Sequence, residues 1–170
     1  MLSFFVLKEA QKRYVGVLVT GLVSRYDIST KEDNLMWKEY NPSPVGRRTG
    51  DCTVRALAKA LGIDWESAYV RLCMNGYAMG SMPDSKEVFS ATLRKNGFYR
   101  KAIPNTCPDC YTAADFCEDN PDGIFVLGFD SHVATVVDGD IYDTYDISKE
   151  VPLIVWYEED MPPKGDEDEL

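Results

Sequence analysis

The sequence predicts an α+β domain in which helices come first and an antiparallel β-sheet follows. Apolar residues recur at helical spacing through residues 53–96, and glycines stand where these stretches end. From residue 98 to residue 157 the apolar runs are short, rich in β-branched and aromatic residues, and separated by turn-forming residues. A chain of 170 residues with 45% hydrophobic content has the length of one compact domain.

Three helices are expected in the first half of the domain. The first covers residues 53–61 and has its apolar stripe at positions 54, 57, 58 and 61. The second runs to Asn75, which leaves 77–83 as a loop, and the third runs to Asn96. The residues suited to cap or end these helices are Gly62 after the first, Asp64 and Gly76 around the second, and Asp84 or Ser85 and Gly97 around the third.

Five strands are expected in the second half, at 98–103, 124–129, 132–137, 141–146 and 153–157. Asp138-Gly139, between the third and fourth strands, is a dipeptide preferred at the centre of a two-residue type I′ turn. The sequence therefore predicts a β-hairpin over residues 132–146.

The register of this hairpin selects one acidic residue as the neighbour of His132. With a two-residue turn, His132 pairs with Tyr145, and side chains alternate between the faces of the strands. Asp143 then shares the face of His132, whereas Asp146 points the other way. A three-residue turn would reverse this choice.

Gly50-Asp51-Cys52 stands at the start of the first predicted helix. Unpaired N–H groups and the positive end of the helix dipole stabilise a thiolate there, so the pKa of Cys52 should fall. The Cys52 N–H could also help bind the oxyanion of a tetrahedral intermediate, and Gly50 allows the backbone or a substrate to approach closely. The alternative is a purely structural thiol.

His132 is the only histidine in the chain. Asp143 could accept a hydrogen bond from one imidazole nitrogen and leave the other for the Cys52 thiol, which is the arrangement of a nucleophile, a base and an orienting group in a catalytic triad. The alternative is a histidine that packs in an ordinary hairpin.

The order of these residues resembles that of the papain-like cysteine peptidases. In that family a small residue and a glycine precede the nucleophile, as Gly50-Asp51 do here, and an Asn-Ser-Trp step matches Asp143-Thr144-Tyr145. The resemblance implies a papain-like fold with Cys52 as nucleophile, His132 as general acid and base, Asp143 as orienting residue and Tyr145 as the aromatic that covers the His–Asp pair.

A more specific resemblance covers about residues 36–158. The stretches that carry it are similar to those of small proteins of Firmicutes and their phages, in which no substrate is known. They are Asn41-Pro42, Gly50-Asp-Cys-Thr-Val-Arg-Ala56, Pro104-Asn-Thr-Cys-Pro-Asp-Cys110 and His132-Val-Ala-Thr-Val-Val-Asp-Gly139.

One position departs from the papain pattern. Papain relatives carry a glutamine six positions before the nucleophile to complete the oxyanion hole, and Gly46 stands there in this chain. Asn41, Arg47 and Arg48 are the nearby donors, and Asn41 is the preferred substitute because a neutral amide can donate without pairing to a carboxylate.

Five cysteines, an odd number, and the absence of a convincing signal peptide predict a reduced, cytoplasmic protein. The resemblance to proteins of Firmicutes and their phages implies that this is the cytoplasm of a bacterial or phage-infected cell. Cys107, Cys110 and Cys117 raise the alternatives of zinc binding and redox chemistry, but a structural zinc site needs four ligands and Cys73 would have to be the fourth. We expect a cysteine-containing turn that packs the short helical run 111–117, with no metal and no cofactor.

The charge distribution excludes some partners. The net charge is −10 and no basic stripe offsets it, which argues against nucleic-acid binding, and no apolar run is long enough to cross a membrane. The Arg47-Arg48 pair could bind an acidic group of a substrate, or it could be a pair of solvated loop charges.

Met74, Met79 and Met82 could line a substrate groove, although such methionines more often fill gaps in a core.

The sequence thus predicts an N-terminal extension at 1–35, a papain-like catalytic domain at 36–158 and an acidic, disordered tail at 159–170. The expected activity is hydrolysis of a peptide or amide bond in a peptide or protein substrate, through a Cys-His-Asp triad and an acyl-enzyme. The same triad would serve an acyltransferase or a deamidase. The alternative from a different functional class is a catalytically inactive interaction module. The sequence does not predict an oligomeric state.

Overall fold

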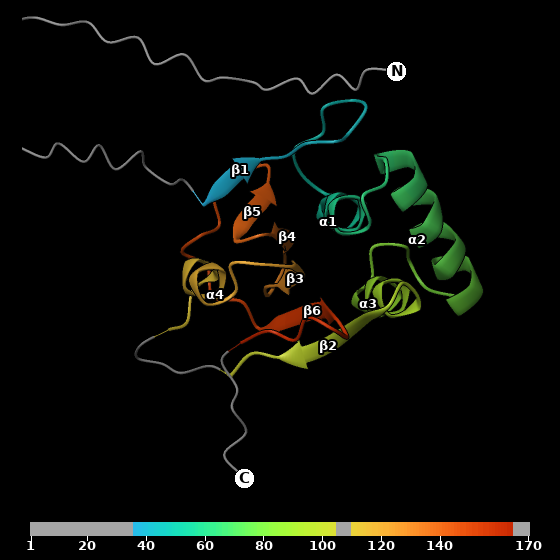
Figure 1. Cartoon of the computed structure of the whole chain (residues 1–170). Coiled ribbons are helices and arrows are strands. Elements are labelled where there is room, and N and C mark those ends of the chain that lie inside the picture. The colour runs from blue at the N-terminus through green and yellow to red at the C-terminus, as the bar shows by residue number, and fades with distance from the viewer. Residues whose placement is uncertain (1–35, 105–109, 165–170) are drawn as a thin grey trace, which may run out of the picture. The chain divides into compact units, whose positions relative to one another are not determined.

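The computed structural model describes residues 36–104 and 110–164. Within these residues the fold is α+β, with four helices and a six-stranded mixed sheet (Figure 1). In chain order the elements are β1 (Trp37–Glu39), α1 (Cys52–Leu61), α2 (Trp65–Met79), α3 (Lys86–Lys95), β2 (Phe98–Ala102), α4 (Ala113–Asp119), β3 (Ile124–Gly128), β4 (Val133–Val137), β5 (Asp140–Asp143) and β6 (Ile154–Glu158).

The strand order is β1-β5-β4-β3-β6-β2. Every pairing is antiparallel except that of β1 with β5, which is parallel. The expectation of an antiparallel sheet is therefore wrong at this edge. The reason is that β1, which the sequence does not predict, has only three residues and no alternation of apolar and polar side chains that would mark a strand.

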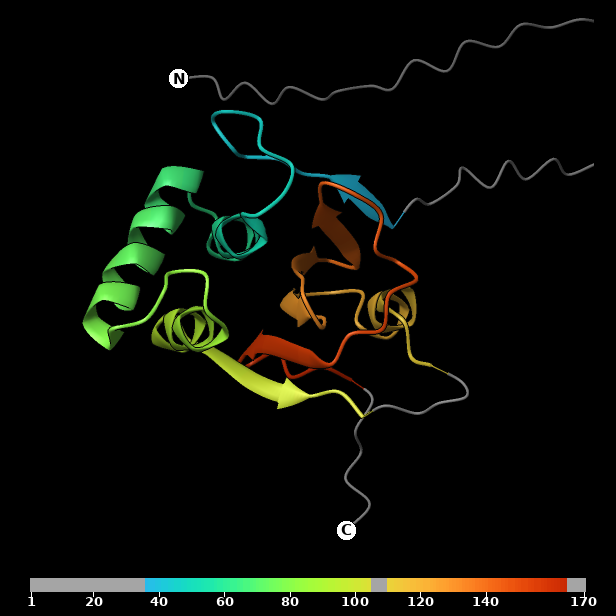
Figure 2. The same ribbon diagram turned by 180° about the vertical axis from the view of Figure 1, so that it is seen from behind.

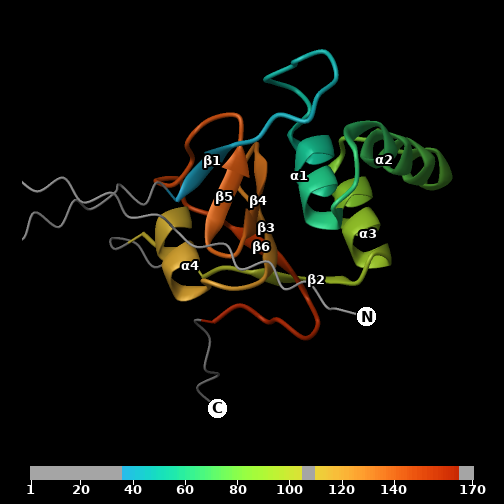
Figure 3. The same cartoon turned by 45° about the horizontal axis from the view of Figure 1, so that its top comes forward.

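Helices cover both faces of the sheet. In Figures 1 and 2, α1, α2 and α3 lie on one side of the strands and α4 lies on the other, and Figure 3 shows the same arrangement from above. Alternate residues of the central strands supply the two cores. Val126 and Trp156 pack with α1, α2 and α3, whereas Phe125, Leu127 and Val155 pack with α4.

The second helix is longer than the sequence predicts. It continues through Gly76 to Met79 and ends at Gly80, whose φ of 64° is left-handed. Gly76 is buried within the helix, and a Cβ there would lie 2.8 Å from the Ser81 carbonyl oxygen. This glycine therefore permits a close approach of the following turn and does not stop the helix.

The hairpin has the predicted two-residue turn. Asp138 and Gly139 have φ values of 50° and 77°, as a type I′ turn requires, and Val137 pairs with Asp140. The predicted register is confirmed over the three residue pairs of the β4–β5 ladder. The last strand of the hairpin ends at Asp143, three residues earlier than expected.

The remaining boundaries lie close to those predicted. Ser85 caps α3 through a hydrogen bond to the Val88 N–H, and α4 begins after a capping box at Thr112. The predicted extension at 1–35 lies outside the described residues. Part of the predicted tail, up to residue 164, is described, and there the Lys164 N–H donates to Asn120 Oδ1 at 2.7 Å. No helix in the described ranges is long and apolar enough to span a membrane.

Removal of residues 1–35 should leave a folded protein with an equally reactive Cys52. The first strand begins at Trp37, and the Met36 carbonyl accepts a hydrogen bond from the Ile141 N–H. A variant that begins at Met36 therefore keeps this strand and this hydrogen bond. Urea unfolding and Cys52 labelling of the truncated and full-length chains test this expectation. Loss of cooperative unfolding would contradict it, and faster labelling would show that the segment covers the site.

Candidate active site

The structure brings Cys52, His132 and Asp143 together. Cys52 is the first residue of α1, His132 directly precedes β4, and Asp143 is the last residue of β5. Because β4 and β5 are antiparallel neighbours, the start of one and the end of the other lie at the same end of the sheet. The Thr135 hydroxyl donates to the Ala56 carbonyl at 2.9 Å and ties α1 to β4.

Asp143 and His132 are directly hydrogen bonded, through Asp143 Oδ2 and His132 Nε2. The predicted neighbour relation is therefore present. Cys52 and His132 lie close enough for each to shift the pKa of the other, and Nδ1 is the ring nitrogen that Asp143 does not occupy. Asp146 is exposed and instead accepts a hydrogen bond from the Ser148 N–H at 2.9 Å.

The pKa of the Cys52 thiol lies below its usual value. Burial has the largest single influence and raises this pKa. The hydrogen bond and charge of His132, the Val133 N–H and the charge of Arg55 together outweigh burial. The lowered pKa makes the thiolate of Cys52, at the N-terminus of α1, easier to form than that of an ordinary cysteine.

The pKa of His132 is shifted in the opposite direction. Burial lowers it, but hydrogen bonds with Asp143 and Cys52 and the charges of both residues raise it to about 9. The two shifts have opposite signs, and each moves its group toward the charged form.

Aromatic rings cover the imidazole. The rings of His132 and Tyr145 have centroids 5.1 Å apart at an interplanar angle of 42°, and Phe129 lies at 6.4 Å on the same imidazole. Tyr145 is half-exposed, so it shields the His132–Asp143 pair from one direction without closing the site.

Gly50 and Asp51, the two residues before Cys52, differ in their structural roles. Gly50 has a φ of 79°, in the left-handed region that favours glycine. Asp51 is buried, and its carboxylate accepts hydrogen bonds from Arg55 Nη1 and from Trp65 Nε1, the latter at 3.0 Å. Asp51 therefore belongs to a buried hydrogen-bond network, and it does more than leave space in front of Cys52.

Because Asp51 is engaged in this way, its side chain does not cap α1. The first N–H groups of a helix have no partners within the helix, so those of Cys52 and Thr53 face no capping oxygen from Asp51. Both residues line the cavity described below. These N–H groups are suited to bind an oxyanion.

Sequence reasoning missed Arg55. Its side chain is only 4% exposed, and it donates to Asp51 through Nη1 and to Asp143 Oδ1 through Nη2 at 3.2 Å. The Thr144 N–H donates to the same oxygen at 2.7 Å. The available signal was an Asp–Arg pair at i,i+4 at the start of a mainly apolar helix, where a buried charged side chain needs a partner.

Asn41 lies elsewhere. Its Oδ1 accepts a hydrogen bond from the Ser43 N–H at 3.2 Å, and Asn41 is not among the residues that line the cavity next to Cys52. Arg48 donates to the Thr144 carbonyl at 2.6 Å and to Glu39 at 2.7 Å, and the Arg47 N–H donates to the Ser43 hydroxyl. The position of Asn41 gives no support to its predicted oxyanion role, and the N–H groups at the start of α1 are nearer candidates because Cys52 and Thr53 line the cavity.

A cavity of about 300 Å³ opens beside Cys52 and His132. This is near the lower end of the size range of ligand sites. Charged side chains contribute to its wall, and Lys86 Nζ donates to the Asp130 carbonyl at 3.0 Å. The aromatic and aliphatic residues in the lining are Phe89, Phe129, Val133, Leu153, Ile154 and Trp156.

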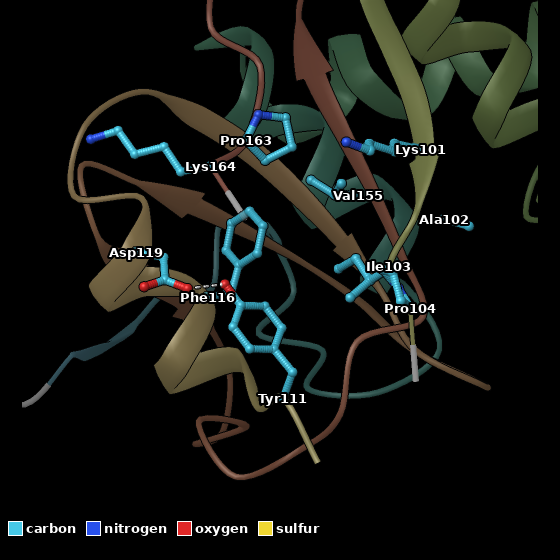
Figure 4. A pocket seen from close by; sticks show the side chains of 10 residues that line it. All are labelled: Lys101, Ala102, Ile103, Pro104, Tyr111, Phe116, Asp119, Val155, Pro163 and Lys164. Atoms are coloured by element: carbon cyan, nitrogen blue, oxygen red, sulfur yellow. Dashed lines mark hydrogen bonds between the residues drawn. The ribbon is translucent and has the colours of Figure 1, made fainter. Parts of the chain in front are cut away.

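A second cavity, of about 240 Å³, adjoins α4 (Figure 4). Tyr111 and Asp119 are joined across it by a hydrogen bond of 2.7 Å, and Pro104 and Pro163 form part of its wall. Its lining contains none of the predicted catalytic residues.

The other cysteines do not form a metal site in the described part of the chain. Burial raises the pKa of Cys117 to about 12, with a further contribution from Asp140, and Cys110 is exposed. Cys107 lies outside the described residues. Cys73 belongs to α2, across the sheet from α4 (Figure 1), so it is not placed to be a fourth ligand with Cys117. No group of three His, Cys, Asp or Glu residues suited to a metal occurs among residues 36–104 and 110–164.

Neither of the two alternatives for the methionines is observed. Met74, Met79 and Met82 are exposed, and none lines the cavity next to Cys52. They therefore neither fill a gap in the core nor contribute to the wall of that cavity.

A comparison with protein-family models, with curated proteins and with solved structures finds no match to this chain. The geometry alone therefore indicates what the site can do: it combines a thiol of lowered pKa, an imidazole oriented by a carboxylate, helix N–H groups that Asp51 does not cap and an adjacent cavity.

Proposed function

We propose that this protein is a papain-like thiol hydrolase that cleaves a peptide or amide bond through an acyl-enzyme. The observation that carries the proposal is the placement of Cys52, His132 and Asp143 together at the start of α1, with Asp143 bonded to His132 and His132 acting on the Cys52 thiol. These residues combine a lowered thiol pKa with a raised imidazole pKa, as a nucleophile and its acid–base partner require.

In the first half of the proposed reaction, the Cys52 thiolate attacks the substrate carbonyl carbon, and the carbonyl π electrons move to its oxygen. The N–H groups of Cys52 and Thr53 stabilise this oxyanion. As the intermediate collapses, the C–N bond breaks and His132 donates its Nδ1 proton to the departing amine. The product of this half is a thioester on Cys52.

In the second half, neutral His132 takes a proton from water, whose oxygen attacks the thioester carbon. The C–S bond then breaks, which releases the carboxylic acid and restores the thiolate and the imidazolium. Asp143 holds the ring so that Nδ1 faces the sulfur, and it stabilises the charge on His132.

Two further features support a papain-like arrangement. The nucleophile begins a helix that packs on the sheet carrying the histidine, and Tyr145 covers the imidazole at the position where the family has an aromatic residue. A peptide segment is the substrate class we propose, because the cavity beside Cys52 has both apolar walls and backbone donors.

Selective alkylation tests this proposal without a known substrate. At pH 6 iodoacetamide should modify Cys52 rapidly and the other cysteines slowly, because the pKa of Cys52 is lowered and that of Cys117 is raised. Peptide mapping by mass spectrometry identifies the modified residue. His132→Ala should abolish the selectivity, since the imidazolium stabilises the thiolate.

Equal labelling of Cys52, Cys73 and Cys117 at that pH would contradict the proposal. A reactive Cys52 that turns over no member of a diverse peptide and amide library would instead favour an interaction module that has kept the site without catalysis.

A further inference from the structure

We propose that Arg55 is a positioning residue of this site: its guanidinium holds Asp143 in the orientation that serves His132, and Asp51 anchors the guanidinium. This inference rests on the proposed function and extends it. The contacts run from Trp65 to Asp51, from Asp51 to Arg55, and from Arg55 to Asp143.

The first argument is geometric. Asp143 has two carboxylate oxygens with separate partners: Oδ2 serves His132, while Oδ1 accepts from Arg55 Nη2 and from the Thr144 N–H. Donors that hold Oδ1 fix the plane of the carboxylate and hence the direction of Oδ2. Arg55 therefore acts on the imidazole through Asp143 and not by direct contact.

The second argument concerns the anchoring of Arg55. A long side chain positions another group only if it is itself held. Asp51 engages Nη1, and Trp65 Nε1 fixes the second oxygen of Asp51 at 3.0 Å. Arg55 and Asp51 lie one helical turn apart, and the side chains of both are only 4% exposed. Water does not compete effectively for these contacts.

The third argument is energetic. A buried ion pair is often no more stable than apolar residues of the same volume, so stability alone is a poor reason for this arrangement. Arg55 Nε has no hydrogen-bond partner among the described residues, which adds a desolvation penalty. The guanidinium of Arg55 contacts Asp51 and Asp143, and Asp143 orients His132. The orientation of Asp143 therefore explains why a buried arginine stands here, where an apolar residue would pack as well.

The fourth argument is electrostatic. The charge of Arg55 is one of the influences that lower the pKa of Cys52, after burial, His132 and the Val133 N–H. The groups that raise the pKa of His132 are Asp143 and Cys52. Removal of Arg55 should therefore weaken the stabilisation of the thiolate and release Asp143 from its fixed orientation.

The test measures the pH dependence of Cys52 alkylation by iodoacetamide in the full-length chain. Arg55→Gln should raise the midpoint, because the thiol loses a positive charge that lowers its pKa and Asp143 loses a donor that holds it beside His132. Arg55→Lys, which keeps the charge, should restore most of the shift. Arg71→Gln is the matched control, because Arg71 is exposed and bonds only to Asn96 in the described structure.

A double-mutant cycle distinguishes positioning from a structural role. If Arg55 acts through Asp143, then Arg55→Gln should change the alkylation profile much less in an Asp143→Asn background than in the wild type. A residue needed only for stability would lower the urea midpoint while leaving the profile of the folded protein unchanged. If Arg55→Gln does not fold, the pair Arg55→Gln with Asp51→Asn removes the unpaired carboxylate and is measured in its place.

The outcomes separate the two proposals. An alkylation midpoint of an ordinary thiol in the wild type would overturn the proposed function itself. A low midpoint in the wild type that a folded Arg55→Gln variant leaves unchanged would overturn only the role of Arg55, as would full additivity with Asp143→Asn.

Discussion

Asp143→Ala should depress turnover by up to about four orders of magnitude, because loss of the orienting acid has this effect in other triads. In this chain Asp143 Oδ2 is bonded to His132 Nε2, and its removal leaves the imidazole without the group that fixes its orientation and charge. Asp143→Asn should be tolerated better, since an amide oxygen can still accept from the imidazole. Turnover of a reporter substrate, or the rate of labelling by a cysteine-directed activity probe, measures the effect.

Asp146→Ala is the matched control. Asp146 lies three residues away in the same segment, is exposed, and bonds only to the Ser148 N–H in the described structure. Its loss should leave the rate within a few-fold of the wild type. If Asp146→Ala abolished labelling of Cys52 and Asp143→Ala did not, the assignment of the third catalytic residue would be wrong.

Asp51→Ala should destabilise the folded protein by about 3–5 kcal/mol, the usual cost of removing one partner of a buried ion pair. Asp51 is 4% exposed, and its loss leaves the Arg55 guanidinium with one acidic contact and the Trp65 N–H without its acceptor. Urea unfolding followed by tryptophan fluorescence gives the free energy of unfolding.

Glu39→Ala removes one partner of an exposed ion pair and serves as the comparison. Glu39 Oε1 and Arg48 Nη1 are 2.7 Å apart, but both side chains are more than half exposed, at 56% and 58%. Exposed pairs contribute less than about 1 kcal/mol. Equal effects of the two substitutions would show that the Asp51–Arg55 pair is not buried as described.

Local chemistry explains which parts of the site the sequence predicts correctly. Asp138-Gly139 allows positive φ at both turn positions, which fixes a two-residue turn, and the period of two along a strand then places Asp143 and not Asp146 beside His132. The position of Cys52 at a helix start follows from an apolar stripe that begins just after it. These features depend on residues that are near one another along the chain.

Other local signals are ambiguous, and packing decides their meaning. A glycine such as Gly76 near the end of an apolar stripe predicts a helix stop, yet here the helix continues because the following turn needs the space of the missing side chain. The β1 strand is short and carries exposed charged residues, so its parallel pairing with β5 is decided by a distant segment and not by its own composition.

Packing also decides which residues become the partners of the buried charged side chains. Arg55 and Asp143 are 88 positions apart and meet only when α1 packs against the end of β5. In the sequence, Asp51 and Arg55 have the i,i+4 spacing of an ordinary surface pair. The sequence by itself therefore determined that Cys52 begins a helix and that Asp143, not Asp146, lies beside His132, because turn geometry and helix periodicity are local. Only the tertiary structure decided that a buried arginine joins them, because burial and long-range charge pairing arise when separate elements pack together.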